Sequence, residues 1–341
     1  MKLPTLDKFP KHVLAAMDVQ RTFIESRVIV AAERLQVFRA LQGKHMTADK
    51  LGRALGIHKK YREAFLNSLA GLGLLHKANG EYGNTWLAEK YFLRERSIYW
   101  TRQYSKECVQ AYEALTDLEN VLTMGRRPAP RGGPKPLSYT AAMTKDRRRA
   151  EDFTQMLFYL HQEDAKALAK RLDLTDRRAL LDVGGGSGVM SIALAKKNQR
   201  LRACVLDLAN VCRAAAKNIR RAGLSRRIGT MAGDIRKPLP RGYDVVLFCD
   251  IGPVSEQLLR SAFASLPAGG LVVAVDRYLS EDRTKPLDRV VAQLVGSSFP
   301  TVTGSEMVEA LQSCGFKKVT ARRVYRDVWA IRGVKPGRAV E

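Results

Sequence analysis

A short apolar run that ends in an acid and a cluster of glycines constrains this chain more than any other feature. Residues 179–183 (ALLDV) have the apolar character of a buried strand, and residues 184–188 (GGGSG) follow as a glycine turn. Apolar residues then recur at helical spacing over residues 189–197. Glycines let the backbone approach a ligand closely, and a helix start presents free N–H groups. This order of strand, glycine turn and helix therefore predicts the first unit of a nucleotide-binding α/β domain.

The spacing of the glycines narrows the choice of ligand. Gly184, Gly186 and Gly188 alternate, and Val189 stands where a dinucleotide-binding loop would place its third glycine. No Lys-Ser/Thr pair follows the glycines, which excludes a phosphate-binding P-loop. Asp182, directly before the loop, favours a ligand that carries positive charge.

Two further acids follow later strands of the same predicted sheet. Residues 201–206 read as a second strand that ends at Asp207, where a carboxylate can accept hydrogen bonds from a ribose diol. Asp234 and Ile235 come after another short segment. We expect Asp234 to hold an adenine amino group and Ile235 to pack on the ring. Residues 243–249 (YDVVLFC) are predicted to be the fourth strand.

The glycine loop and these ordered acids resemble the S-adenosylmethionine (SAM) methyltransferases. The likeness is to small-molecule methyltransferases of the plant and bacterial O-methyltransferase type, and it extends roughly over residues 19–334. It implies an α/β fold, with a Rossmann-like seven-stranded SAM methyltransferase sheet preceded by an all-α/winged-helix domain. It also implies SAM as the cofactor, no metal, and a homodimer. The predicted cofactor-binding residues are Asp182, Gly184, Gly186, Asp207, Leu208, Asp234, Ile235 and Cys249.

The residues before the glycine loop predict the winged helix. Thr47 is expected to cap a helix over residues 48–55, a second helix is expected over residues 59–72, and Asn79-Gly80 is typical of a hairpin turn. The predicted domains are a winged-helix dimerisation domain at 1–95, a helical connector with a Pro/Gly/Arg-rich linker at 96–150, and a SAM-binding methyltransferase domain at 151–341.

The net charge and the cysteine content limit which binding partners and which cellular compartment are expected. The formal net charge is +24, and the excess is spread over both halves of the chain instead of forming a basic tail. This favours either a generally basic proteome or a small acidic substrate over a nucleic-acid-binding arm. Arg126, Arg127 and Arg131 could contact such a substrate. The five cysteines show no C-x-x-C spacing, and no signal peptide or membrane span is visible. We therefore expect a cytoplasmic protein without a membrane span.

A second class of function stays open because of the winged helix itself. Lys59, Lys60 and Arg62 lie where a DNA-binding winged helix would have its recognition helix. The alternative function is therefore an RNA- or DNA-binding methyltransferase, or a SAM-binding winged-helix regulator. We expect nucleic acid to be the weaker interpretation, because in the resembling family this module dimerises.

The segment after the fourth predicted strand departs from the family pattern. O-methyltransferases of the family carry a His-Asp pair there, whose histidine is the general base, but residues 248–257 read FCDIGPVSEQ. Without this histidine, three interpretations are open. The acceptor atom is an activated carbon that needs only positioning, or another residue of the chain is the general base, or the chain binds SAM without methylating an acceptor. Together with residues 297–304, the segment resembles the bacteriochlorophyllide C-methyltransferase branch, so the predicted acceptor is an aromatic or tetrapyrrole-like small molecule.

If another residue replaces the histidine as the general base, three residues are candidates. They are His161, Asp250 and Glu256. His161 belongs to a helix predicted over residues 150–172 from its apolar stripe. For each candidate, a solvated polar residue or a helix-start acid is the competing interpretation.

Overall fold

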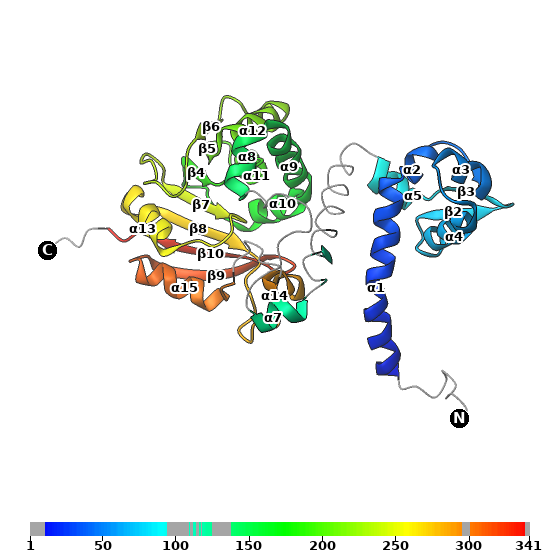
Figure 1. Cartoon of the computed structure of the whole chain (residues 1–341). Coiled ribbons are helices and arrows are strands. Elements are labelled where there is room, and N and C mark those ends of the chain that lie inside the picture. Colours follow the sequence, from blue (N-terminus) through cyan, green and yellow to red (C-terminus); the bar gives the residue numbers. More distant parts are fainter. Residues whose placement is uncertain are drawn as a thin grey trace. The chain divides into compact units, whose positions relative to one another are not determined.

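The computed structural model describes residues 11–93, 118–124, 138–294 and 301–337, together with Val109, Tyr112, Glu113 and Thr116. The chain divides into two compact units, Met1–Gln110 and Ala111–Glu341 (Figure 1). The division falls inside the predicted connector, while the bounds of the three predicted domains stay a prediction. No helix in the described part of the chain is long and apolar enough to cross a membrane.

The first unit is a winged helix. Its elements are α1 (Lys11–Arg34), α2 (Val37–Ala40), β1 (Met46–Thr47), α3 (Ala48–Ala54), the 3₁₀ turn η2 (Lys59–Tyr61), α4 (Arg62–Gly71), β2 (Leu75–Ala78), β3 (Glu81–Asn84), α5 (Trp86–Ala88) and the π-helical turn η3 (Glu89–Leu93). The strands are ordered β1-β3-β2. The Thr47 side chain accepts a hydrogen bond from the Lys50 N–H, which confirms the predicted cap. Leu51, Leu66 and Leu69 are fully buried between the helices and the hairpin.

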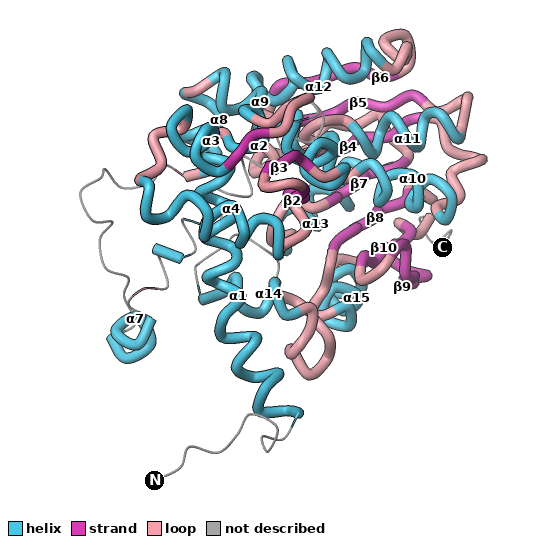
Figure 2. The backbone as a smooth tube through the Cα atoms, turned by 90° about the vertical axis from the view of Figure 1, so that its right-hand side faces the viewer, coloured by secondary structure: helices cyan, strands magenta, loops and turns pink. Residues whose placement is uncertain are grey.

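The second unit is built on a seven-stranded sheet in the order β6-β5-β4-β7-β8-β10-β9 (Figure 2). Its strands are β4 (Ala179–Val183), β5 (Arg202–Asp207), β6 (Ile228–Ala232), β7 (Val245–Cys249), β8 (Leu271–Asp276), β9 (Lys317–Tyr325) and β10 (Val328–Val334). β4 to β8 pair in parallel, and β10 runs antiparallel to both β8 and β9. The predicted seven-stranded sheet is confirmed. Because parallel strands end at one edge, the carboxyl ends of β4 to β8 define the place for a ligand.

Helices cover both faces of this sheet. They are α8 (Tyr139–Lys145), α9 (Arg147–Leu160), α10 (Gln162–Arg171), α11 (Val189–Lys197), α12 (Ala209–Arg221), α13 (Glu256–Ser265), α14 (Leu287–Leu294) and α15 (Gly304–Ser313), besides the short α7 (Leu118–Met124). Leu180 packs with α10, α11 and α12 on one face, while Leu181 packs with α13 and α15 on the other. Alternate strand residues thus serve two cores, as expected for a sheet buried on both sides.

The continuous helix predicted over residues 150–172 is wrong. The structure has two helices there, α9 and α10, and His161 lies between them with φ −92° and ψ 14°. The apolar periodicity continues across the junction, so the bend leaves no signal in the hydrophobic pattern. His161 stands at this junction, and its side chain is held by acids on two sides, as described below.

Candidate active site

The glycine loop between β4 and α11 adopts a backbone that favours glycine. Gly184, Gly186 and Gly188 have φ values of +65°, +52° and +74°. A Cβ atom on Gly184 would also lie 2.7 Å from Cγ2 of Ile251, in the segment after β7. The loop therefore lies directly against the carboxyl end of β7, and a side chain at position 184 would both strain the backbone and displace Ile251.

Asp207 anchors this loop from the end of β5. Its Oδ2 accepts a hydrogen bond from the Gly186 N–H at 2.9 Å, and its Oδ1 accepts one from the Leu208 N–H at 2.7 Å. The residue is 7% exposed, and burial raises the pKa of its carboxyl. Each carboxylate oxygen has a further lone pair, so Asp207 can still accept hydrogen bonds from a diol.

Asp182 lies beneath the loop with one unsatisfied oxygen. The residue is fully buried, and its Oδ2 accepts a hydrogen bond from the Ser191 hydroxyl at 2.6 Å. No described residue bonds to Oδ1. Burial, together with the charge of Asp207, raises the pKa of Asp182 to about 6. A buried carboxylate oxygen without a partner beside a glycine loop fits a cationic ligand such as SAM.

Asp234 and Ile235 follow β6 in a different environment. Arg236 donates two hydrogen bonds to Asp234 from its guanidinium edge, at 2.9 Å from Nε to Oδ1 and 2.7 Å from Nη2 to Oδ2. This pairing lowers the pKa of Asp234 to about 2. Ile235 packs at the edge of the core beneath β7. The adenine contact therefore stays a prediction, in which a ligand would share Asp234 with an exposed arginine.

The remaining predicted cofactor residues flank the loop. Leu208 packs against a small apolar cluster that includes Ala142 and Met143 of α8, so α8 lies beside the end of β5. The Asn210 side-chain amide donates to the Met143 carbonyl at 2.9 Å and fastens that helix. Cys249 ends β7, and burial raises the pKa of its thiol well above the ordinary value. Its thiol is therefore protonated at neutral pH.

A cluster of five charged side chains lies at the carboxyl ends of β7 and β8. His161 Nδ1 lies 3.2 Å from Asp164 Oδ2, and His161 Nε2 lies 3.2 Å from Asp250 Oδ2. Arg289 Nη2 lies 3.2 Å from Asp250 Oδ1 and 3.5 Å from Asp276 Oδ1. We call these five residues the charge cluster. It joins two of the three predicted catalytic candidates, His161 and Asp250, and adds three residues that the sequence analysis missed.

Contacts within the charge cluster set the protonation of His161 and Asp250 at neutral pH. Burial alone would lower the pKa of His161, but the carboxylates of Asp164 and Asp250 raise it to about 9. Burial alone would raise the pKa of Asp250, but His161 and Arg289 hold it below the ordinary value. At neutral pH, His161 is therefore an imidazolium and Asp250 a carboxylate with cations on both oxygens. Neither group is well suited to take a proton.

Glu256, the third catalytic candidate, is not part of the charge cluster. It occupies the first turn of α13 and pairs with Arg260 one turn later, at 2.5 Å from Oε1 to Nη2. Its side chain is 65% exposed. This is the behaviour of a helix-start acid, which was the competing interpretation of the sequence.

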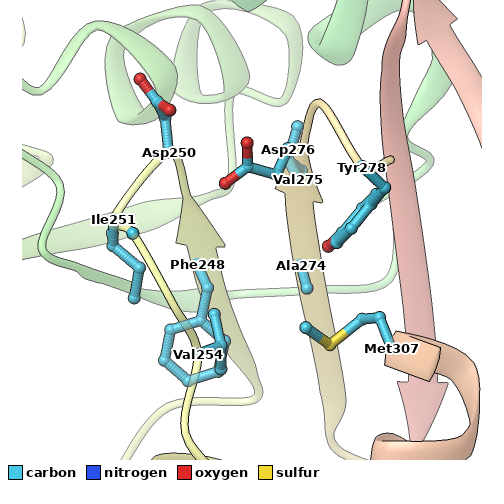
Figure 3. Close-up of a pocket in the computed structure, with 10 residues that line it drawn as sticks. Phe248, Asp250, Ile251, Val254, Ala274, Val275, Asp276, Tyr278 and Met307 are labelled. Carbon is cyan, nitrogen blue, oxygen red and sulfur yellow. The ribbon is translucent and has the colours of Figure 1, made fainter. Parts of the chain in front are cut away.

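A small cavity opens beside the charge cluster (Figure 3). The carboxyl groups of Asp250 and Asp276 lie at one end of it, on neighbouring strands, while Tyr278 and Met307 line it further along. The cavity holds about 10 Å³, which is close to the space for one water molecule. Asp250 has φ +51°, a conformation that costs free energy and is concentrated at functional sites.

Some parts of the sequence prediction lie outside the described residues. These are Arg126, Arg127 and Arg131, and positions 297–300 of the segment that resembles the bacteriochlorophyllide enzymes. Among the residues that the structure does describe, no group of three or more His, Cys, Asp or Glu side chains is arranged to hold a metal ion.

Comparison with known families decides what this arrangement is. A family profile described as "O-methyltransferase domain" matches residues 132–312, and one described as "O-methyltransferase dimerisation domain" matches residues 17–94. The chain belongs to the O-methyltransferase family. It is a SAM-dependent methyltransferase, and SAM is its cofactor. The family predicted from the sequence is thereby confirmed.

Individual relatives differ in the atom that they methylate. The chain is 30% identical over 308 residues to 3-hydroxy-5-methyl-1-naphthoate 3-O-methyltransferase of Streptomyces sahachiroi, which covers 88% of each chain. It is 28% identical over 329 residues to L-tyrosine C(3)-methyltransferase of Streptomyces lavendulae, which covers 89% of this chain and 87% of that enzyme. O- and C-methylating enzymes thus both resemble this chain over most of its length.

Two further comparisons bear on the sequence predictions. The chain is 29% identical over 191 residues to bacteriochlorophyllide d C-20 methyltransferase of Chlorobaculum tepidum, covering 52% of this chain and 56% of that enzyme. Among solved structures, human N-acetylserotonin methyltransferase in complex with SAM superposes with a TM-score of 0.80 at 20% identity, covering 98% of this chain and 100% of that one. The second likeness shows that the fold is shared.

Proposed function

We propose that this enzyme transfers the methyl group of SAM to a ring carbon of a phenolic small molecule. The observation that carries the proposal is the charge cluster. Its Asp250 lies in the segment after β7, where the resembling O-methyltransferases carry a His-Asp pair and this chain has no histidine. When bound, SAM supplies an electrophilic methyl group. A phenol becomes nucleophilic at its ring carbons when its hydroxyl loses a proton, so such an acceptor needs positioning and a proton acceptor.

The relatives support a phenolic acceptor, and they leave both the hydroxyl oxygen and a ring carbon as candidates for the methylated atom. The two full-length relatives are named for a hydroxynaphthoate and for tyrosine, and both compounds carry an aromatic hydroxyl. One is named for transfer to oxygen and the other for transfer to carbon. Transfer to oxygen without a histidine base is therefore the second candidate. A tetrapyrrole-like acceptor is the third, because the corresponding relative covers only half of the chain.

The nucleic-acid alternative has little support from α4. Arg62 is engaged by Asp49 at 2.6 Å and by the Ile57 carbonyl at 2.8 Å. The exposed residues of α4 carry no positive charge, and they are Glu63, Ala64, Asn67, Ser68 and Gly71. Reading DNA with this helix would bring Glu63 towards the phosphates, which is unfavourable. Lys59 and Lys60 are exposed but lie in the turn before the helix.

A homodimer is proposed on the basis of the dimerisation domain. Ile24 of α1 supports it, because it is a large apolar side chain that is 52% exposed on a described helix. A cytoplasmic location remains a prediction. It rests on the free cysteines and on the ordinary composition of the chain.

The proposal is tested by finding which atom receives the methyl group. The enzyme is incubated with SAM labelled with ¹³C in the methyl group, using L-tyrosine, hydroxynaphthoic acids and simple phenols as acceptors. We expect S-adenosylhomocysteine and a product whose labelled methyl carbon correlates with ring carbons and ring protons by NMR. A labelled methyl group bonded to oxygen would overturn the transfer to carbon. SAM binding without S-adenosylhomocysteine from any acceptor would favour the non-methylating alternative.

A further inference from the structure

Asp276 ends β8 with one carboxylate oxygen engaged and the other available. Oδ1 accepts a hydrogen bond from the Arg277 N–H at 2.7 Å and lies 3.5 Å from Arg289 Nη2. Within the described residues, no hydrogen bond to Oδ2 is found, whereas Oδ1 has one. The residue is only 7% exposed, and it lines the cavity beside Asp250 and Tyr278 (Figure 3). A carboxylate oxygen is thus held at the cavity wall without a partner of its own.

The sheet places this oxygen close to the glycine loop. β7 pairs with β4 on one side and with β8 on the other, and Cys249 is opposite Val275. The Asp250 N–H donates to the Val275 carbonyl at 3.1 Å, so the pairing extends to the end of both strands. Gly184 meets Ile251 directly after β7. A ligand in the glycine loop and an acceptor at the mouth of the cavity would therefore lie at the carboxyl ends of two strands that are separated only by β7.

Asp276 also differs from the other candidates in its capacity to take a proton. His161 has a carboxylate 3.2 Å from each ring nitrogen, and Asp250 has a cation 3.2 Å from each oxygen. Burial and the charge of Asp250 raise the pKa of Asp276 to about 6, although Arg289 opposes the shift. At neutral pH the group is ionised, and it is more basic than an ordinary carboxylate. These are the properties required of a general base.

We infer that Oδ2 of Asp276 takes the proton that the acceptor loses during methyl transfer. This inference rests on the proposed function and names the catalytic residue that replaces the missing histidine. The hydroxyl proton of the phenolic acceptor leaves for Oδ2, and an electron pair of the resulting phenolate forms the bond between the ring carbon and the methyl carbon. The C–H bond at that ring carbon then breaks, its electron pair restores the aromatic ring, and its proton passes to solvent while the oxygen takes one up. The electron pair of the broken S–C bond stays on sulfur. The protonated Asp276 then returns its proton to solvent.

Several charged or titratable groups face Asp276 and set the pH at which it works. Asp250 lies at the end of β7, Arg289 on α14 and His161 between α9 and α10, while Arg277 and Tyr278 follow on its own strand. Among these groups only Asp276 changes charge in this range of pH, because the pKa of His161 is near 9 and that of Asp250 is held below its ordinary value. Asp182, beneath the glycine loop, also has a pKa of about 6, so the Arg289→Gln variant serves to assign the rise to Asp276. We therefore expect kcat/KM to rise with pH through about 6.

Asp276→Asn, measured against acceptors of graded acidity, is the deciding experiment. With phenols that are protonated at the assay pH, the variant should lose about 100-fold or more in kcat. With nitrophenols that are already ionised, it should approach wild-type kcat, because the hydroxyl proton has been lost before binding and Asp276 has no hydroxyl proton to take. Asp288→Asn is the matched control, since Asp288 pairs with Arg277 and is largely exposed. Its kcat should stay near that of the wild type with every acceptor.

The outcomes separate this inference from the proposed function. If the wild-type enzyme methylates no acceptor, both the proposed function and this inference are contradicted. An active wild type with an equal loss for protonated and ionised acceptors in Asp276→Asn, or with no loss, would overturn the inference alone. S-adenosylhomocysteine binding and a thermal melt establish that the variant is folded. If Asp276→Asn does not fold, the Arg289→Gln variant tests the inference instead. Loss of the arginine charge should raise the pKa of Asp276 and so move the acidic limb of the pH profile to higher pH. An acidic limb that does not move would contradict the assignment of the base to Asp276.

Discussion

Replacing Asp207 by Ala should weaken SAM binding by about 100-fold or more. Hydrogen bonds to a charged group each contribute about 1.5–3 kcal/mol, and two bonds from a ribose diol would be lost together. The substitution also removes the acceptor of the Gly186 N–H, which holds the glycine loop against β5. Since about 1.4 kcal/mol corresponds to a tenfold change in affinity, the loss amounts to two orders of magnitude. Calorimetric titration of SAM and S-adenosylhomocysteine measures it.

Two further variants make this result specific. Asp207→Asn keeps the shape of the side chain and an oxygen for one backbone N–H, so its affinity should fall between those of wild type and Asp207→Ala. Asp176→Ala removes an exposed acidic side chain just before β4, near the amino ends of the parallel strands and away from the glycine loop. It should bind SAM like the wild type. Wild-type affinity in Asp207→Ala would show that the ribose is held elsewhere.

Replacing His161 by Gln should lower the free energy of unfolding by about 3 kcal/mol at about pH 7, because the Asp250 and Asp164 carboxylates lose the cation between them. This figure is at the low end for breaking a buried ion pair, since the side chains of His161 and Asp250 are 18% and 28% exposed. Urea denaturation of wild type and variant measures the difference. His58→Gln, at an exposed position in the first unit, is the matched control and should change little.

The pH dependence of that difference identifies its electrostatic origin. The pKa of His161 is raised from 6.5 to about 9 in the folded state, so the folded protein binds this proton more tightly than the unfolded chain does. The stabilisation is therefore fully present below pH 6.5 and is lost as the pH rises through about 9. The difference between wild type and His161→Gln should shrink between about pH 7 and about pH 10. An equal difference at both pH values would assign it to packing instead.

The cofactor half of the site could be predicted because its signals are local. Strand, glycine turn and helix lie within twenty residues, and the acids at 182 and 207 end strands that are visible as apolar runs. The sheet that brings those strand ends together followed from the resemblance to the family. Ser191, which bonds to Asp182, was missed, although a lone hydroxyl in a buried helical segment is a recognisable signal.

The charge cluster could not be predicted because tertiary structure assembles it. His161 and Asp164 are local neighbours, but Asp250, Asp276 and Arg289 reach them only through the order of the strands and through α14, which the sequence analysis did not predict. The bend at His161 leaves no mark in the apolar pattern. In contrast, the pairing of Asp234 with Arg236 spans two positions, and the charge two residues away could have indicated it.

A crystal structure of the complex with S-adenosylhomocysteine would test the central claim most directly, namely that the methyl donor faces the charge cluster across the glycine loop. The ribose hydroxyls should contact Asp207, the amino-acid end should lie over Gly184 and Gly186 near Asp182, and the sulfur should face the cavity lined by Asp250 and Asp276. A ligand whose sulfur points away from β7 and β8 would contradict this account, because neither Asp276 nor the rest of the cluster could then reach the acceptor.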